Sequence, residues 1–326
     1  NVKAEALLGQ HSSVRLRCGK QPERFFDGIV CEFGSTGQSG RYYTYRMVLR
    51  PWLWLLSRNR QCRVFQKETA VEIFQKVLAD YQDKDLDTRL TATLQPREYC
   101  VQYRESDLAF VSRIFEEEGI YYYFKHEKGS HKLVLADAPA AHEPVPEYES
   151  MSYRRSDKDA PGPSLLSWRT NKRIQAGAFE HTDFDFKKPK ANLVTSGSHP
   201  GEYQNAEAEV FDYPGAYTES SVGDERARIR MQEIAARFET SEGATDAAGL
   251  FPGALFTLKD CPRDDDNREY LITAASYDAD SGAFESGSKA SLRFGAAITG
   301  IDKANNYRPP RYTSPPVIHG AQTATV

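Results

Sequence analysis

The sequence predicts a mainly β protein with α+β segments, and three features of its 326 residues predict this class. Aromatic residues make up 12% of the chain, and 22 Gly and 17 Pro are spread along it, which favours strands and turns over a helical bundle. Runs of alternating apolar and polar residues stand near both ends. Between them lie stretches with the apolar spacing of amphipathic helices.

The first β block follows from alternating residues and turn signals. Strands are predicted at Val14–Cys18, Phe25–Phe33 and Tyr43–Leu49. Gly34–Gly40 is predicted to be a flexible turn, and Pro51 stops the third strand.

The last β block repeats this order. Its predicted strands are Leu255–Lys259, Tyr270–Tyr277 and Ala290–Phe294. A Leu and a Gly precede the first strand of both blocks, at Leu8-Gly9 and at Leu250 with Gly253. We therefore expect an internal duplication, although two unrelated antiparallel meanders can share this pattern.

Helices are predicted between the blocks. Thr69 and Glu72 have the spacing of a capping box, and the apolar residues after them predict a helix over residues 70–81. A second helix is expected to start at Ser106 and to end before Gly119, a residue type that suits a left-handed cap. A third helix is expected near Ser221, at another capping-box spacing.

Shorter strands and loops connect these helices. Further strands are predicted at Ile120–Phe124, Lys132–Leu135, Leu165–Ile174, Ala178–Phe186 and Glu207–Tyr213. The first two form a hairpin that turns around Gly129. Residues 137–164, rich in Pro, Ala, Ser and charge, are predicted to be a linker or a long surface excursion, and residues 192–205 to be a loop.

Composition excludes several function classes. A net charge of -4 and a pI of about 6.0 argue against a dedicated nucleic-acid binder. The longest apolar run, Trp52–Leu56, is far shorter than the ~20 residues that cross a bilayer. Five widely spaced Cys without a zinc-type pattern predict free thiols and a reducing compartment. No basic stretch followed by an apolar run opens the chain, so we expect no signal peptide and, without an initial Met, an internal fragment.

No catalytic, cofactor-binding or metal-binding residue is predicted. The nucleophile elbow, the phosphate-binding loop, the dinucleotide fingerprint and the zinc-protease motif are absent. His126 and His131 flank the predicted hairpin turn and could approach each other, but the sequence offers no third metal ligand beside them. A solvent-exposed hairpin tip is the favoured interpretation.

Four other runs are interpreted as structural. Glu116–Glu118 offers carboxylates for acid–base chemistry, but a helix C-terminus disfavours negative charge, so a solvated face or a partner-facing edge is favoured. Asp264–Asp266 lacks the downstream Glu of a calcium loop and is predicted to be a solvated loop tip. Tyr121–Phe124 is predicted to be a strand packed on both faces, and Lys187–Lys190 carries too few charges for a nucleic-acid site.

Several motifs resemble those of one family, in that family's order. They are Arg97–Tyr103 with Glu105–Asp107, Glu117–Tyr123, Phe179–Pro189, Asp212–Gly215, and the end Tyr307–Pro310 with Pro316–Val326. Each motif alone is weakly specific, but the ordered set covers essentially the whole chain. It resembles the VgrG family, the spike proteins of the bacterial type VI secretion system, whose N-terminal part is similar to phage tail hubs.

The resemblance implies both the fold and the partners. It implies two related β-barrel domains with α/β segments between them, assembled as a homotrimer, and a hexameric tube protein of the Hcp kind as partner. It implies a tip protein and effectors bound through C-terminal parts beyond this sequence, and no catalytic residue or cofactor. Assembly in the cytoplasm, followed by secretion into target cells without a signal peptide, is implied as well.

Domain boundaries follow from combining the pattern with the resemblance. We expect a first β-barrel at residues 1–52 that lacks the family's first strands, an α/β segment and linker at 53–164, a second β-barrel at 165–305 with a helical insertion at about 191–249, and at 306–326 a linker and the start of a truncated OB-fold domain.

The expected function is a trimeric symmetry adapter between tube and needle. Two barrels in each of three chains would offer six similar surfaces to the tube, with loops around Gly34–Gly40 and Ser281–Lys289 as candidate docking loops. A contractile phage baseplate hub is an alternative. It would have the same physical role, and only the machine in which it is assembled would differ. A cell-wall-degrading enzyme, suggested by abundant carboxylates and aromatic strands, is a less favoured alternative.

Overall fold

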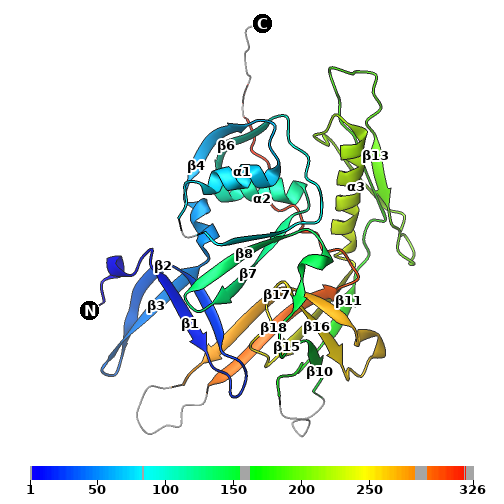
Figure 1. The fold of residues 1–326 in the computed structure, drawn as a ribbon. Coiled ribbons are helices and arrows are strands. Elements are labelled where there is room, and N and C mark those ends of the chain that lie inside the picture. Colours follow the sequence, from blue (N-terminus) through cyan, green and yellow to red (C-terminus); the bar gives the residue numbers. More distant parts are fainter. Residues whose placement is uncertain (1, 83, 155–161, 283–291, 319, 321–326) are drawn as a thin grey trace.

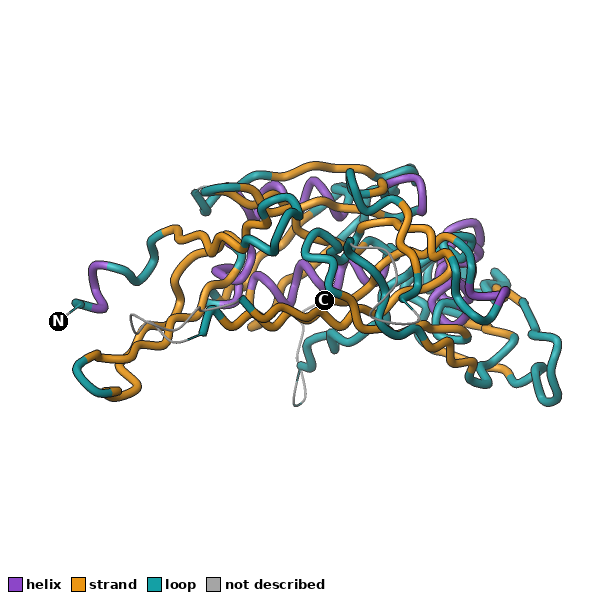
Figure 2. The backbone as a smooth tube through the Cα atoms, turned by 90° about the horizontal axis from the view of Figure 1, so that it is seen from below, coloured by secondary structure: helices purple, strands orange, loops and turns teal. Residues whose placement is uncertain are grey.

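The computed structural model describes residues 2–82, 84–154, 162–282, 292–318 and 320. Sheets dominate this part of the chain, so the predicted mainly β class with α+β segments is confirmed (Figure 1). Figure 2 shows an elongated molecule with the N-terminal segment at one end. None of its described helices has the length and apolar character needed to cross a membrane.

The first sheet is an antiparallel meander of β1 (His11–Leu16), β2 (Arg24–Ser39) and β3 (Tyr42–Arg50). The predicted flexible turn at Gly34–Gly40 is wrong, because β2 continues to Ser39 by pairing with β3. This stretch carries no alternation of its own, and its strand form depends on the tyrosine-rich partner strand opposite. The resulting long hairpin projects from the body of the molecule (Figure 1).

The largest sheet has seven strands, in the order β10-β16-β17-β18-β15-β11 with β9 beside β16. Their bounds are β9 (Glu143–Pro144), β10 (Ser150–Ser152), β11 (Arg169–Lys172), β15 (Glu239–Thr245), β16 (Ala254–Lys259), β17 (Glu269–Asp280) and β18 (Arg293–Asp302). Its core contains the packed rings of Trp168, Phe256 and Tyr270. β9 and β10 lie in the predicted linker, where burial of Met151 and Tyr148 rather than sequence alternation holds the chain to the sheet.

No closed barrel is formed by the strands of the described residues. The first sheet is open, with three strands. The seven-stranded sheet has no continuous strand pairing around a closed ring, but Leu165 and its neighbour contact strands on both sides of it. The Leu165 N–H donates to the Ser152 carbonyl of β10 at 3.0 Å, and the Leu166 N–H donates to the Ala244 carbonyl of β15 at 2.8 Å. The sheet therefore curves far enough for one residue to bridge β10 and β15.

The meanders β1–β3 and β16–β18 match in detail. Gly9 donates its N–H to the Val30 carbonyl at 2.9 Å, and Gly253 donates its N–H to the Ile272 carbonyl at 2.8 Å. Both glycines have a positive φ, +80° and +93°. In each meander a β-bulge follows directly after the accepting residue, between Val30 and Glu32 in β2 and between Ile272 and Ala274 in β17.

The register around these glycines also matches. Two residues after Gly9, His11 pairs with Ile29, and two residues after Gly253, Leu255 pairs with Leu271. The same strand order, register and bulge position are what a duplication predicts.

The segment between the meanders holds two helices against small sheets. α1 (Ala70–Leu78) and α2 (Asp107–Glu117) pack with the 3₁₀ segment Trp52–Ser57 in one buried cluster. The strands of this region are β4 (Arg60–Phe65) paired with β6 (Cys100–Ser106), and β5 (Leu86–Arg89), β8 (Ser130–Ala136) and β7 (Tyr121–Glu127) in one sheet.

Local signals locate the ends of α1 and α2. The predicted capping box is confirmed, because the Glu72 N–H donates to Thr69 Oγ1 at 3.3 Å and the Thr69 N–H donates to Glu72 Oε2 at 2.8 Å. α1 ends at Leu78, three residues before the predicted end. Ser106 caps α2 by accepting from the Ala109 N–H, and Gly119 has the expected positive φ of +68°.

α3 (Ser220–Ala235) packs beside a third small sheet of β13 (Thr195–Ser198), β12 (Ala178–His181) and β14 (Glu209–Asp212). The capping box predicted at Ser221 is wrong: Glu219 is the N-cap, and no side chain caps the helix. β13 lies in the predicted loop 192–205. It has few apolar residues, and pairing with β12 and packing on α3 decide its form.

Candidate functional site: the C-terminal strap and its contacts

Residues 303–318, here called the strap, follow β18 and run between α2 and α3 toward the C-terminal side of the molecule (Figure 1). Any part of a longer chain beyond this point would connect to the sheets through the strap. The contacts of the strap therefore decide how firmly such a part would be held to the sheets. Its side chains bind α2, β7, α3 and β14.

Arg308 is the buried centre of the strap, with 5% of its surface exposed. Its Nε donates to Gln232 Oε1 of α3 at 2.8 Å, and its Nη1 donates to the Gly119 carbonyl after α2 at 2.9 Å. Burial lowers the pKa of Arg308 below its ordinary value. A Cβ at Gly119 would lie 2.8 Å from Ile229 Cγ2 and 3.0 Å from Arg308 Cδ, so glycine permits this approach as well as the positive φ.

Three further contacts hold the strap on either side of Arg308. Thr313 donates its N–H and Oγ1–H to the two carboxylate oxygens of Glu116 at 2.9 and 2.8 Å. Arg311 forms an ion pair with Asp212 at the end of β14, at 3.1 Å. The ring of Tyr307 packs edge-on against Tyr121 of β7, with centroids 4.9 Å apart.

The three glutamates at the end of α2 are engaged within the chain. Arg97 donates to Glu117 at 2.6 Å and to Glu118 at 2.5 Å, and Glu116 binds the strap. The predicted solvated face is therefore wrong, whereas the alternative of a partner-facing edge stays a prediction. Although burial raises it, the pKa of Glu117 stays below its ordinary value because Arg97 lies beside it and donates to it.

The repulsion between the glutamates and the negative end of the α2 dipole is also offset by a nearby cation. Arg230 of α3 donates its Nη2–H to the Glu116 backbone carbonyl at 2.5 Å, which places a cation at the C-terminus of α2. The sequence signal for this arrangement is weak, because Arg97 and Arg230 are far from the glutamates along the chain.

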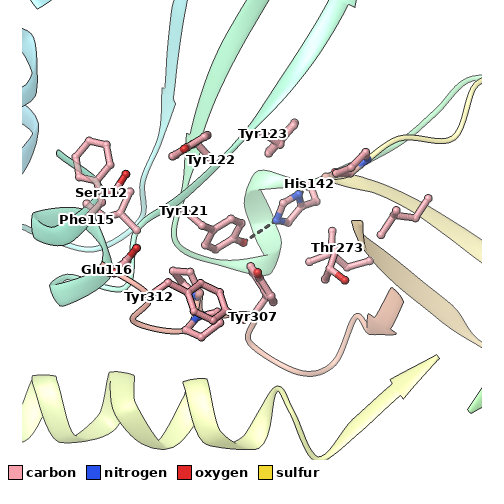
Figure 3. Close-up of a pocket in the computed structure, with 17 residues that line it drawn as sticks. Ser112, Phe115, Glu116, Tyr121, Tyr122, Tyr123, His142, Thr273, Tyr307 and Tyr312 are labelled. Atoms are coloured by element: carbon pink, nitrogen blue, oxygen red, sulfur yellow. Dashed lines mark hydrogen bonds between the residues drawn. The ribbon is translucent and has the colours of Figure 1, made fainter. Parts of the chain in front are cut away.

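A cavity of about 240 Å³ lies beside the strap, and Figure 3 shows its lining side chains. Its walls come from α2, β7, β17 and the strap. His142 Nδ1 lies 2.9 Å from the Gly253 carbonyl and donates to it, so His142 Nε2 accepts from the Tyr121 hydroxyl at 2.7 Å. Burial lowers the pKa of His142, which keeps this ring neutral.

The cavity geometry favours packing over bond making. The Tyr121–His142 pair satisfies its own polar atoms, and Glu116 is engaged by Thr313. Tyr121 and Tyr123 are buried on one face of β7, while Tyr122 on the other face is 37% exposed and lines the cavity. The prediction that Tyr121–Phe124 packs on both faces is confirmed, since Phe124 packs against the cluster of α1 and α2.

The predicted hairpin of β7 and β8 places His126 opposite His131, with ring centroids 5.7 Å apart. The expected approach is confirmed. The tip itself, residues 127–130, is exposed as predicted, but the prediction is wrong for His131, of which only 3% is exposed. The first sheet covers His131: Asp27 of β2 accepts from His131 Nδ1 at 2.7 Å, and the Asp27 N–H donates to His126 Nδ1 at 3.2 Å.

His11, Asp27 and His131 place possible metal-ligand atoms within 4.8 Å of one another. The hydrogen bonds argue against a metal at this position. His131 Nε2 accepts from the Trp52 N–H at 2.8 Å, so the proton of the neutral ring is on Nδ1, which donates it to Asp27. His131 thus keeps no free lone pair for a metal, and the cluster joins two parts of the fold.

The remaining sequence candidates lie apart from the strap. Asp264 and Asp265 are exposed as predicted, but Asp266 is buried and accepts from Thr170 Oγ1 at 2.7 Å, so the loop-tip interpretation is wrong for this residue. Lys187 and Lys188 are exposed and pair with nearby glutamates. All five cysteines are free, as predicted.

Comparisons with known proteins agree with this fold. Residues 1–283 match the family described as phage tail baseplate hub (GPD). The chain is 36% identical over 332 aligned residues to the type VI secretion system spike protein VgrG1b of Pseudomonas aeruginosa, an alignment that covers 100% of this chain and 44% of that protein. The chain therefore spans less than half the length of that relative.

Two solved structures show a similar fold. The c3393 protein of E. coli, described as a type VI secretion component similar to the phage T4 tail proteins gp27 and gp5, matches with a TM-score of 0.70 at 20% identity, covering 98% of this chain and 72% of that one. The Francisella PdpA–VgrG complex matches with a TM-score of 0.55 at 12% identity, covering 90% and 47%. Because the family match spans most of its length, this chain belongs to the phage tail baseplate hub family and is a relative of the VgrG spike proteins.

Proposed function

We propose that this chain is the hub of a type VI secretion spike, a homotrimer that adapts a threefold needle to a hexameric tube during effector delivery. The duplicated meander, with its matching glycines and bulges, is the observation that carries the proposal. Two similar sheets in each of three chains provide six similar surfaces around one axis. A closed cyclic assembly needs only one kind of interface, repeated three times.

The hairpins of the two meanders supply candidate docking surfaces. β2–β3 and β17–β18 extend toward the same end of the molecule (Figure 1). On β3, Tyr43 is 62% exposed, and Tyr42, Tyr45 and Met47 are 39–45% exposed. An exposed apolar row of this kind is typical of a surface that another protein covers. Of the two expected docking loops, Gly34–Gly40 is part of this hairpin, while residues 283–289 lie outside the described residues.

The strap supplies the candidate connection to the needle. It leaves on the side of the molecule away from the hairpins (Figure 1). The relatives are longer than this chain, which supports an OB-fold domain and a needle beyond the strap, with the tip protein and effectors bound there. The Francisella structure contains VgrG in complex with PdpA, which supports partner binding by spikes of this kind.

The proposal includes a non-enzymatic role and a cellular path. The named relatives are spike proteins, which supports a structural role, assembly in the cytoplasm and secretion into target cells. The 36% sequence identity to a secretion spike protein favours this function over that of a contractile phage baseplate hub, whose fold would be similar.

Native mass spectrometry and binding to the hexameric tube protein of the same bacterium test the proposal together. We expect a trimer and a complex of one trimer with one tube hexamer. Tyr43→Glu on the β3 row should weaken tube binding about tenfold or more, whereas Tyr99→Glu, at a tyrosine 60% exposed outside both hairpins, should not. A monomer that hydrolyses cell-wall material and does not bind the tube would overturn the hub function.

A further inference from the structure

Arg24, the first residue of β2, places its guanidinium close to two aromatic rings, one in its own strand and one in a distant segment. Its Cζ lies 5.2 Å from the ring centre of Phe26 in β2 and 5.0 Å from that of Phe251 in the loop before β16. Both distances are those of cation–π contacts. The guanidinium therefore lies where the first sheet meets the seven-stranded sheet.

The hydrogen-bond donors of Arg24 have no protein acceptor in the part of the chain that the structure describes. Its Nε is buried without a partner, and no described carboxylate forms an ion pair with it. Burial lowers the pKa of Arg24, which Tyr277 and Tyr148 only partly offset. By contrast, Arg97 meets two carboxylates.

A partly buried cation without an anion is costly, and cation–π contacts replace only part of the lost hydration. The N–H groups of a guanidinium point outward in its plane, so an anionic ligand binds along that edge. A carboxylate fits that edge with two parallel hydrogen bonds. The unpartnered Nε of Arg24 thus favours a planar oxyanion as the ligand.

We propose that Arg24, with Phe26 and Phe251, forms a binding site for a carboxylate. The carboxylate belongs either to a small free acid or to an Asp or Glu side chain of a second copy of this chain; the recognised group is the same. Arg24 takes part in none of the strap contacts described above, and this inference does not depend on the proposed hub function.

Thermal melting in sodium formate, compared with sodium chloride at equal ionic strength, tests the free-acid source. The variants are Arg24→Met, which removes the donors, and Arg24→Lys, which keeps the charge but loses the fork. Arg58→Met is the matched control, because Arg58 also contacts a ring, Trp54, at 4.6 Å, but its Nε has a partner in Ser57. Formate at ten times its Kd should raise the Tm of the wild type and of Arg58→Met by about 2 °C, and that of both Arg24 variants by less than half as much.

The dissociation constant of the oligomer tests the second source. If a partner supplies the carboxylate, formate leaves the wild-type Tm unchanged, and Arg24→Met and Arg24→Lys raise that constant about tenfold or more, while Arg58→Met does not. If formate has no specific effect and the Arg24 variants associate like the wild type, the proposal is overturned. Should Arg24→Met fail to fold, Arg24→Lys alone is compared with the wild type in both the melting and the association measurements.

Discussion

The Asp27 carboxylate accepts a 2.7 Å hydrogen bond from His131 Nδ1, and neither side chain is exposed to solvent. The pair joins β2 to β8 across 104 residues of sequence. Ser13 donates to the second carboxylate oxygen at 2.6 Å. Although burial raises it, the pKa of Asp27 is below its ordinary value because Ser13, His131 and His11 donate to the ionised form.

Removal of this carboxylate is expected to loosen the first sheet. Asp27→Ala leaves the His131 N–H buried without an acceptor and should lower the free energy of unfolding by about 2–4 kcal/mol. Asp27→Asn keeps one acceptor oxygen and should cost about half as much. Urea denaturation followed by tryptophan fluorescence measures both variants. Equal stability of Asp27→Ala and the wild type would contradict a structural role for this cluster.

Stability should fall as the pH decreases from about 6.5 toward 4. Burial, with the nearby charge of Arg24, lowers the pKa of His126 to about 4 in the folded state, and burial lowers the pKa of His142 and His181 as well. In this pH range the unfolded chain binds protons that the folded chain does not, so protonation favours unfolding. Because His126 keeps some contact with solvent, its own share is about 1–3 kcal/mol.

Urea denaturation at a series of pH values measures this effect. His126→Gln should flatten the stability profile between pH 6.5 and pH 4, whereas Gln at the exposed His199 should leave it unchanged. A His126→Gln profile as steep as that of the wild type would show that the other histidines or the carboxylates dominate.

Gly119→Val is expected to be destabilising by more than an ordinary surface change. The backbone there has a φ of +68°, and a Cβ would meet Ile229 and Arg308. The expected loss is about 2–4 kcal/mol, measured by denaturant titration. Gly295→Val in β18 is a matched control, because a Cβ at that position meets nothing within 4 Å. Similar melting of both variants would contradict the crowded left-handed cap.

The buried contact of the strap should matter more than its exposed one. Arg308→Ala leaves Gln232 and the Gly119 carbonyl without their partner, and should cost about 2–3 kcal/mol and expose the strap to proteolysis. Arg311→Ala breaks a more exposed ion pair and should cost less than about 1 kcal/mol. Limited chymotrypsin digestion with mass analysis compares the variants, because neither substitution removes the aromatic cleavage sites Tyr307 and Tyr312 of the strap. Identical cleavage patterns would mean that Arg308 does not hold the strap.

The five free thiols should differ in reactivity. Cys62 is exposed, whereas Cys18, Cys100 and Cys261 are buried, and burial raises the pKa of Cys18 and Cys100. Thiol titration of the native protein should therefore report Cys62 first, and denaturation without reductant should bring the total to five. A total well below five in freshly purified protein would contradict the reducing compartment.

Several elements were predictable because their signals are local. The Thr69 and Glu72 capping box and the left-handed Gly119 each depend on interactions within a few residues, and both are present. The repeated order of strands around Gly9 and Gly253 was also visible, since alternation and turns recur along the chain. By contrast, β13 and the end of β2 lack such patterns and take strand form only through pairing.

The charged and polar residues show most clearly what could not be predicted from the sequence. Glu116–Glu118 has the composition of a solvated run, yet Arg97, Arg230 and the strap surround it after folding. His131 stands beside a hairpin turn, yet Asp27 and the first sheet bury it.

The sequence by itself determined the β-rich class, the capped starts of α1 and α2, the repeated meander and the family resemblance, because local sterics and periodicity depend on neighbouring residues. Only the tertiary structure decided which charges are paired, which histidine is buried and how the strap is held. Burial and ion pairing depend on distance in space, and residues such as Asp27 and His131 are brought together only by the packing of distant segments.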